Sequence, residues 1–183
     1  MLRPLLSIGL MALGLAPAAE ASTFRRITFP ELMATTSAVV QVKVLDTESY
    51  WYGDEHGYIT TVAHLEVVRS LDGSFDVGEE LYVREAGGEL DGYVMQAIGF
   101  PQFDVGDELV LFLGTWLDDS GDWRVNEYGQ GIYEVFTGAD GIERVVPANV
   151  QGHRANRSEV TAETVVPTMT PVTDLIQTIR ATH

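Results

Sequence analysis

The sequence predicts a mainly β protein, either a β-barrel or a β-sandwich, with a short helix before the strands and an amphipathic helix after them. Three observations support this expectation. Apolar and polar residues alternate in about seven or eight short segments, the segments come at near-regular spacing, and Gly and Asp residues mark the turns between them. This pattern is typical of closed barrels and of sandwiches. The length of 183 residues fits one domain.

Residues 1–21 are predicted to be a signal peptide that is removed from the mature chain. Arg3 gives a positive start, an apolar stretch follows over residues 5–15, and a small-x-small cleavage pattern ends the segment. The apolar run is shorter than the roughly 20 residues of a typical membrane span. We therefore expect an exported protein, periplasmic or extracellular, that begins at Ser22 and has no membrane span after cleavage.

A short helix is predicted to begin after Thr28. Thr28 and Glu31 have the spacing of a capping box, in which each side chain accepts a hydrogen bond from the backbone N–H of the other residue. Pro30 falls in the first turn, where its missing N–H costs little. Weak helix formers follow and the pattern then changes, so the helix is expected to be short.

From Ala38 onward the apolar pattern has the period of a β-strand. Val40, Val42 and Val44 share one face of the first strand. The other strands are predicted over the following segments: 59–67, 81–84, 93–98, 109–113, 123–125, 132–136 and 142–145. The segment 109–113 is apolar on both faces, which predicts a central strand covered on each side.

The chain is expected to end in an irregular connector and a helix. Residues 147–169 show no clear period, whereas residues 170–182 start with Thr170 as a plausible cap and Pro171 as the first helical residue. Four apolar residues of this helix form one stripe: Val172, Leu175, Ile176 and Ile179. The stripe is expected to pack on an open end or a face of the barrel.

The capped helix is followed by four longer segments that resemble those of known β-domains: VVQVKV, ITTVAHLEVVRSLDG, VGEELYVREAGGELDG and GFPQFDVGDELVLFL. The most specific piece is Gly87-Gly88 followed by Gly99-x-Pro101-x-Phe103-x-x-Gly106-x-Glu108. On these residues the chain resembles a family of exported, uncharacterised bacterial β-domains. It is also distantly similar to the netrin and tissue-inhibitor-of-metalloproteinase domain. The resemblance covers roughly residues 24–135.

The resemblance implies an OB-like five-stranded barrel with flanking helices, which we place over residues 22–146. In the inhibitor family an N-terminal Cys, held by disulfides, grips the zinc of the protease. Here the expected terminus is Ser22 and the chain has no Cys. The resemblance therefore bears on the fold, and a protease-inhibitor-like or protease-associated role remains one version of the function.

The composition argues against several functional classes. The chain has 11 Lys and Arg against 27 Asp and Glu, a net charge of -16, so we expect no nucleic-acid partner. Without Cys there is no disulfide framework and no thiolate metal site. The four His lack the spacing of a zinc site, and we expect no metal and no cofactor. A weak calcium site in one of the acidic loops is left open.

No catalytic constellation is visible, so we expect no catalytic residue and no enzyme. The segment Asp119-Ser120-Gly121-Asp122 superficially resembles the serine segment of trypsin-like proteases. A turn between strands is the better interpretation, because Asp118 stands where those proteases have Gly. The acidic clusters are expected to be solvated loops.

The candidate binding residues are Tyr50, Trp51, Tyr52 and His56, which are expected in a polar turn between two strands. Three consecutive aromatic residues cannot all be buried, because neighbours in an extended chain point to opposite faces. They favour an exported, non-catalytic binding module that recognises a protein, such as a secreted protease, or an extracellular polymer through loops at one end of the barrel. The alternative is a secreted hydrolase that uses acidic-loop carboxylates and either His56 or His64.

Overall fold

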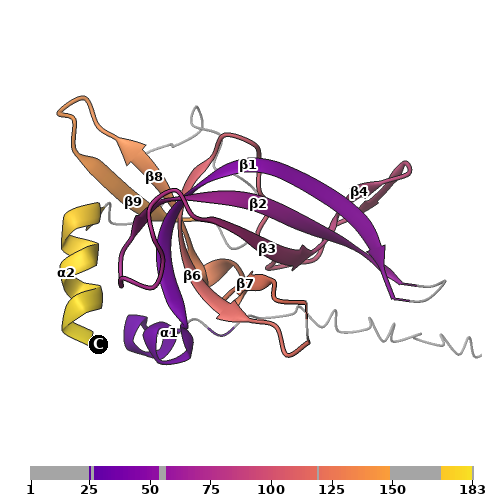
Figure 1. Cartoon of the computed structure of the whole chain (residues 1–183), viewed down its shortest axis with the longest axis horizontal. Helices are drawn as coiled ribbons and strands as arrows, with labels where there is room; N and C mark the ends of the chain where they lie inside the picture. The colour runs from indigo at the N-terminus through magenta and orange to yellow at the C-terminus, as the bar shows by residue number, and fades with distance from the viewer. Residues whose placement is uncertain (1–24, 26, 54–56, 119, 149–169, 183) are drawn as a thin grey trace, which may run out of the picture.

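The computed structural model describes residues 25, 27–53, 57–118, 120–148 and 170–182 (Figure 1). The predicted signal peptide, His56 and most of the predicted connector lie outside these residues. In the described part of the chain, no helix is long and apolar enough to cross a membrane.

Five strands close into a barrel. Around the barrel they follow the order β1 (Ala38–Tyr52), β2 (Tyr58–Ser70), β3 (Glu80–Ala86), β7 (Trp123–Val125) and β6 (Glu108–Thr115). The ring closes because β1 also pairs with β6. All neighbours are antiparallel except β3 and β7, which are parallel. The expected OB-like barrel is confirmed, and its closure removes the β-sandwich alternative.

The first strand extends well beyond the barrel. Residues 38–43 of this strand pair with β6. The rest of the strand, residues 44–52, pairs only with β2. The β1–β2 register is irregular near Val42 and near Asp46, and such irregularities bend the strand where it leaves the barrel. The expected turn over residues 50–52 is therefore wrong. Those three aromatic residues pair with residues 58–60 of β2 and belong to a projecting β1–β2 arm (Figure 1).

A small hairpin crosses this arm. It consists of β4 (Gly88–Leu90) and β5 (Tyr93–Met95), so the strand predicted over residues 93–98 is shorter than expected and β4 was missed. Gly88 allows the crossing, because a Cβ atom there would lie 2.3 Å from Thr61 Oγ1 and 2.7 Å from Ser49 Oγ. Its φ of +134° also suits glycine alone.

The remaining strands leave the barrel at the opposite end. After a 3-10 turn, Tyr128–Gly131, the sheet continues with β8 (Ile132–Thr137), β9 (Glu143–Pro147) and β10 (Thr170–Pro171). The predicted start of the last helix is wrong, because Thr170 and Pro171 pair with β9. The helix α2 spans Val172–Thr182.

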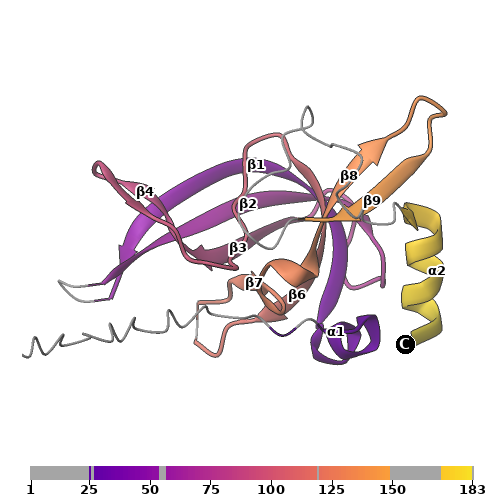
Figure 2. The same ribbon diagram turned by 180° about the vertical axis from the view of Figure 1, so that it is seen from behind.

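The first helix, α1, spans Phe29–Thr35 and has the predicted capping box. The backbone N–H of Thr28 donates to Glu31 Oε2 at 2.7 Å, and the Glu31 N–H donates to Thr28 Oγ1 at 3.4 Å. Both helices lie at the end of the molecule opposite the tip of the arm (Figure 2).

Two apolar clusters lie on the two faces of the central strand β6. Leu109, Leu111 and Leu113 face the barrel interior, whereas Val110 and Phe112 face outward. The outward cluster includes residues of both helices and of β9: Leu32, Met33, Val145, Val172, Leu175 and Ile179. The prediction that residues 109–113 form a central strand covered on each side is confirmed, and α2 packs on a face of the sheet.

Candidate functional site

The three aromatic residues of the arm divide between its two faces. The register of β1 places Tyr50 opposite Thr60 and Tyr52 opposite Tyr58, on the face that also carries Arg84 of β3. Trp51 lies on the other face, with 47% of its surface exposed. The expectation that the three cannot all be buried is confirmed. Burial raises the pKa of the half-buried Tyr50 hydroxyl.

Arg84 is a buried cation at the base of the arm, and only 6% of its side chain is exposed. Its guanidinium lies 5.0 Å from the centre of the Tyr52 ring and 5.1 Å from that of Trp116. Arg84 Nη2 donates to Asp118, and Arg84 Nε lies 3.1 Å from Asp122 Oδ2 in an ion pair. Two rings and two carboxylates therefore hold this charge in place.

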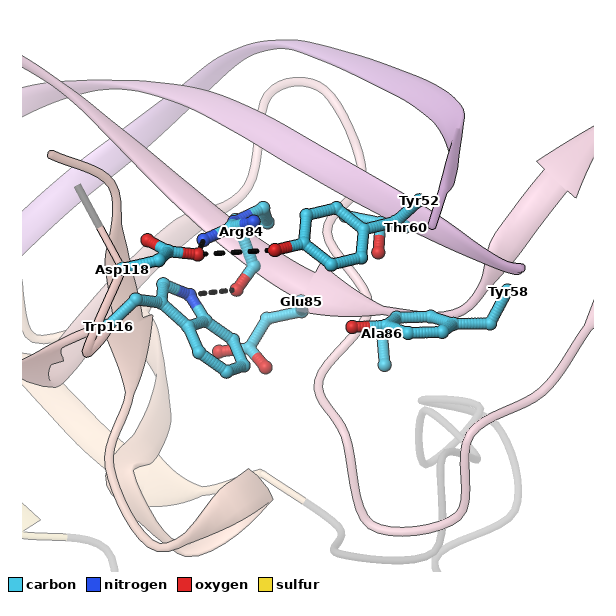
Figure 3. Close-up of a pocket in the computed structure, with 8 residues that line it drawn as sticks. All are labelled: Tyr52, Tyr58, Thr60, Arg84, Glu85, Ala86, Trp116 and Asp118. Carbon is cyan, nitrogen blue, oxygen red and sulfur yellow. Dashed lines mark hydrogen bonds and ion pairs between the residues drawn. The ribbon is translucent and has the colours of Figure 1, made fainter. Parts of the chain in front are cut away.

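The arrangement ties the β6–β7 loop to the arm, as Figure 3 shows. The indole N–H of Trp116 donates to the backbone carbonyl of Arg84 at 3.1 Å, and the Tyr52 hydroxyl donates to Asp118 Oδ2 at 3.4 Å. Hydrogen bonds from Ser120 and then from Arg84 lower the pKa of Asp118 to about 2. Asp118 is thus ionised throughout the physiological range.

The same loop confirms the predicted turn at Asp118, Ser120 and Asp122, whereas Asp119 lies outside the described residues. The Ser120 hydroxyl donates to Asp118 Oδ1 at 2.6 Å, and the Asp122 N–H donates to Ser120 Oγ at 3.1 Å. These bonds are typical of turns built on Asp and Ser side chains. Ser120 also accepts a hydrogen bond from Arg84, so its hydroxyl bonds both within the loop and to β3.

A shallow hollow lies between the arm and this loop. Its lining combines aromatic rings with charged and small side chains: Tyr52, Tyr58, Thr60, Arg84, Glu85, Ala86, Trp116 and Asp118 (Figure 3). The space that this lining surrounds is about 260 Å³ and includes open solvent, so the hollow is a surface depression and not an enclosed ligand cavity.

Glu85, which also lines the hollow, is a buried carboxyl with 3% of its surface exposed. Burial raises the pKa of its carboxyl to about 8, and the backbone N–H of Val125, which donates to Oε1 at 2.6 Å, partly opposes that shift. Glu85 is therefore mostly neutral at pH 7, and it joins β3 to β7 where these strands share only one residue pair.

A second aromatic group lies on the other face of the arm. The rings of Trp51 and Tyr93 meet edge to face, with centroids 5.8 Å apart and planes at 70°. The Trp51 indole N–H points toward Asp91 Oδ2 at 3.4 Å. Tyr93 is 64% exposed, so both rings offer surface to solvent beside a carboxylate.

His64, a candidate histidine of the alternative hydrolase function, lies outside the hollow. The His64 ring stacks on Tyr82 at 4.8 Å, and its Nε2 lies 2.8 Å from Glu80 Oε2. The pair sits on the outer face of β2 and β3, outside the lining of the hollow. In the described ranges, no group of three or more Asp, Glu and His side chains could hold a metal ion.

The sequence predicted Tyr50, Trp51 and Tyr52 as binding residues, and missed the partners that the fold brings to them. Arg84, Glu85, Trp116 and Tyr93 come from other strands and loops. One signal was available for Glu85, because it continues the alternation of Leu81 and Val83 on the interior face of β3. The other three can be assigned only once the barrel closes.

Comparisons with known proteins give no further guidance to function. No model of a protein family matches the chain, and neither the curated proteins nor the solved structures show a significant match. The aromatic residues of the arm, the hairpin and the β6–β7 loop are therefore the features that bear on function.

Proposed function

We propose that the protein is an exported, non-catalytic binding module that recognises a secreted protein, such as a protease, or an extracellular polymer. The binding surface is the aromatic end, defined as Trp51, Tyr52, Tyr58, Tyr93 and Trp116. The observation that carries this proposal is that both faces of the arm carry aromatic side chains: Trp51 and Tyr93 on one face, and Tyr52, Tyr58 and Trp116 on the other. Trp51, Tyr58 and Tyr93 are exposed. Exposed Trp and Tyr on a rigid scaffold are the usual anchors of interfaces.

The position of the aromatic end on the barrel supports the same function by analogy. In OB-type barrels, ligands commonly bind on the face of the second and third strands and at the loops after the first and fourth strands. Here Tyr58 and Arg84 come from the second and third barrel strands, and Trp116 follows the fourth. The pattern over residues 1–21 supports export.

The test is affinity capture from the medium into which the source cells secrete, with the chain immobilised. Trp51→Ala and Tyr52→Ala are expected to lose the captured protein or polymer, because each removes an anchor ring. Ile142→Ala is the matched control, since Ile142 is an equally exposed apolar residue (45%) in the β8–β9 turn. Circular dichroism checks that each variant is folded. Equal capture by all four chains would refute the proposal.

The second candidate is a secreted hydrolase, and the His64–Glu80 pair is the observation that favours it. A histidine held by a carboxylate can act as a general base. A turnover assay over peptide, ester and glycoside substrates tests this function. Activity that His64→Ala abolishes and Ile142→Ala retains would replace the binding module with the hydrolase.

A further inference from the structure

We infer that the group formed by Trp51, Tyr93 and Asp91, here called the Trp51 site, binds the Lys or Arg side chains of a basic protein segment. This inference rests on the proposed function and specifies the chemistry of the partner. It concerns the face of the arm away from Arg84, so it involves neither the hollow nor the β6–β7 loop.

The first argument is the chemistry of the Trp51 site. Trp51 and Tyr93 expose 47% and 64% of their surfaces, and their edge-to-face contact leaves ring surface free for a ligand. A cation within about 6 Å of such a ring is attracted by the electron density of its face. Asp91, next to the indole N–H, adds a full negative charge. Rings beside a carboxylate match a side chain that has an apolar stem and a cationic head.

The second argument is that the site is already formed in the free protein. The β4–β5 hairpin is fixed on the arm by two hydrogen bonds at Gly87, whose N–H donates to the Ile59 carbonyl while its own carbonyl accepts from Thr61 Oγ1. Gly88 then brings the hairpin into close contact with the arm. Little reordering of the backbone is therefore needed on binding, which favours affinity.

The third argument is charge complementarity. The net charge of -16 attracts a basic partner over long distances and repels an acidic one. The nearby cation Arg84 is already neutralised by Asp118 and Asp122. A neutral polymer would gain nothing from this field, so the observations favour a basic protein segment over the polymer.

The test uses calorimetric titration of the full chain with a short peptide of alternating Arg and Gly. Peptides in which Glu or Ser replaces Arg serve as probes of charge. The Arg peptide is expected to bind, and Trp51→Ala or Tyr93→Ala to weaken it about tenfold, the upper part of the cation–aromatic range. Asp91→Asn is expected to weaken it several-fold, and Asn tolerates the positive φ of residue 91.

Two controls separate specific binding from general attraction to an acidic protein. Ile142→Ala removes a similarly exposed apolar side chain elsewhere, and Asp174→Asn removes one carboxylate from α2. Both should leave the affinity within about twofold. If the controls weaken binding as much as the site variants, or if the Ser peptide binds as well as the Arg peptide, the inference is overturned.

The failure of the inference can be told from the failure of the proposed function. If capture from the secreted medium depends on Trp51 but not on Asp91 or on salt, the protein is a binding module for a partner without this positive charge. If capture depends on neither Trp51 nor Tyr52, the proposed function itself is wrong.

Discussion

The buried carboxyl of Glu85 helps to hold β3 against β7, where the barrel closes. Glu85 is almost fully buried and accepts the hydrogen bond of the Val125 N–H. The two strands that it joins share only the pair Val83 and Trp123. The Glu85 side chain therefore provides a hydrogen bond between β3 and β7, whereas backbone pairing provides such bonds between the other barrel strands.

Glu85 should make the stability depend on pH. Because its pKa rises from 4.5 in the unfolded chain to about 8 in the folded protein, the folded state holds the proton more tightly. The contribution of Glu85 to the free energy of unfolding is fully present below pH 4.5. It is lost as the pH rises from there through 8, which lowers the free energy of unfolding by roughly 3–5 kcal/mol. Urea denaturation of Glu85→Gln should show a much smaller loss over this range.

The control for this experiment is Glu85→Ala. It removes the acceptor of the Val125 N–H and should lower the free energy of unfolding at every pH. If Glu85→Gln and the natural protein lose stability in parallel between pH 5 and 8, the buried carboxyl is not the group that titrates.

Gly88 sets how closely the β4–β5 hairpin approaches the arm. Gly88→Ala should destabilise the protein by about 3 kcal/mol, since the new Cβ would overlap the side chains of Thr61 and Ser49. Gly92→Ala is the matched control. Gly92 also has a positive φ, of +78°, but no atom lies within 4 Å of the Cβ position, so the cost should be about 1 kcal/mol. Thermal melts that rank the two variants in the opposite order would contradict this account.

At the scale of elements, the helix α2 covers a sheet face that the barrel does not close. Val172, Leu175 and Ile179 pack with Val110 and Phe112 on the outer side of β6. Sheet strands that are apolar on both faces require such a cover. The helix is thus part of the folding unit, although its position along the chain is remote from β6.

Ile179→Ala should lower the free energy of unfolding by roughly 2–5 kcal/mol, because Ile179 is fully buried and its truncation leaves a cavity. Chemical denaturation gives this value directly. Gln177→Ala, at an exposed position of the same helix, should change stability by less than about 0.5 kcal/mol. A similar effect of both changes would mean that α2 is not docked in solution.

At the scale of the whole molecule, the strong negative charge opposes compactness. A net charge of -16 on one domain causes self-repulsion that folding must overcome. The ion pairs in the described ranges are mostly exposed, and exposed pairs contribute little stability. The apolar clusters on the two faces of β6 therefore provide most of the stability.

Salt should stabilise the protein at neutral pH. Raising sodium chloride from about 20 mM to about 500 mM shortens the screening length and weakens the repulsion. The melting temperature is expected to rise by several degrees in calorimetry. Near the isoelectric point, about 4.4, the same change should have little effect. A melting temperature that falls with salt at pH 7 would show that attractive ion pairs dominate.

The local elements of this protein can be predicted from the residues within each element. The capping box of α1 and the turn at Asp118 and Ser120 are formed by contacts between residues close in the chain. The central position of β6 follows from the apolar pattern of that strand alone. Periodicity could not show that β1 continues to Tyr52, because the polar and aromatic residues there carry a turn signal as well as a strand signal.

The candidate site, in contrast, is assembled by contacts between distant parts of the chain. Trp51 meets Tyr93 and Asp91 because a hairpin crosses the arm at Gly88, and Arg84 meets Asp118 because the β6–β7 loop folds back on β3. These contacts join residues more than 30 positions apart. They depend on barrel closure, which no local pattern encodes, since alternation fixes which face a side chain occupies but not which strand lies beside it.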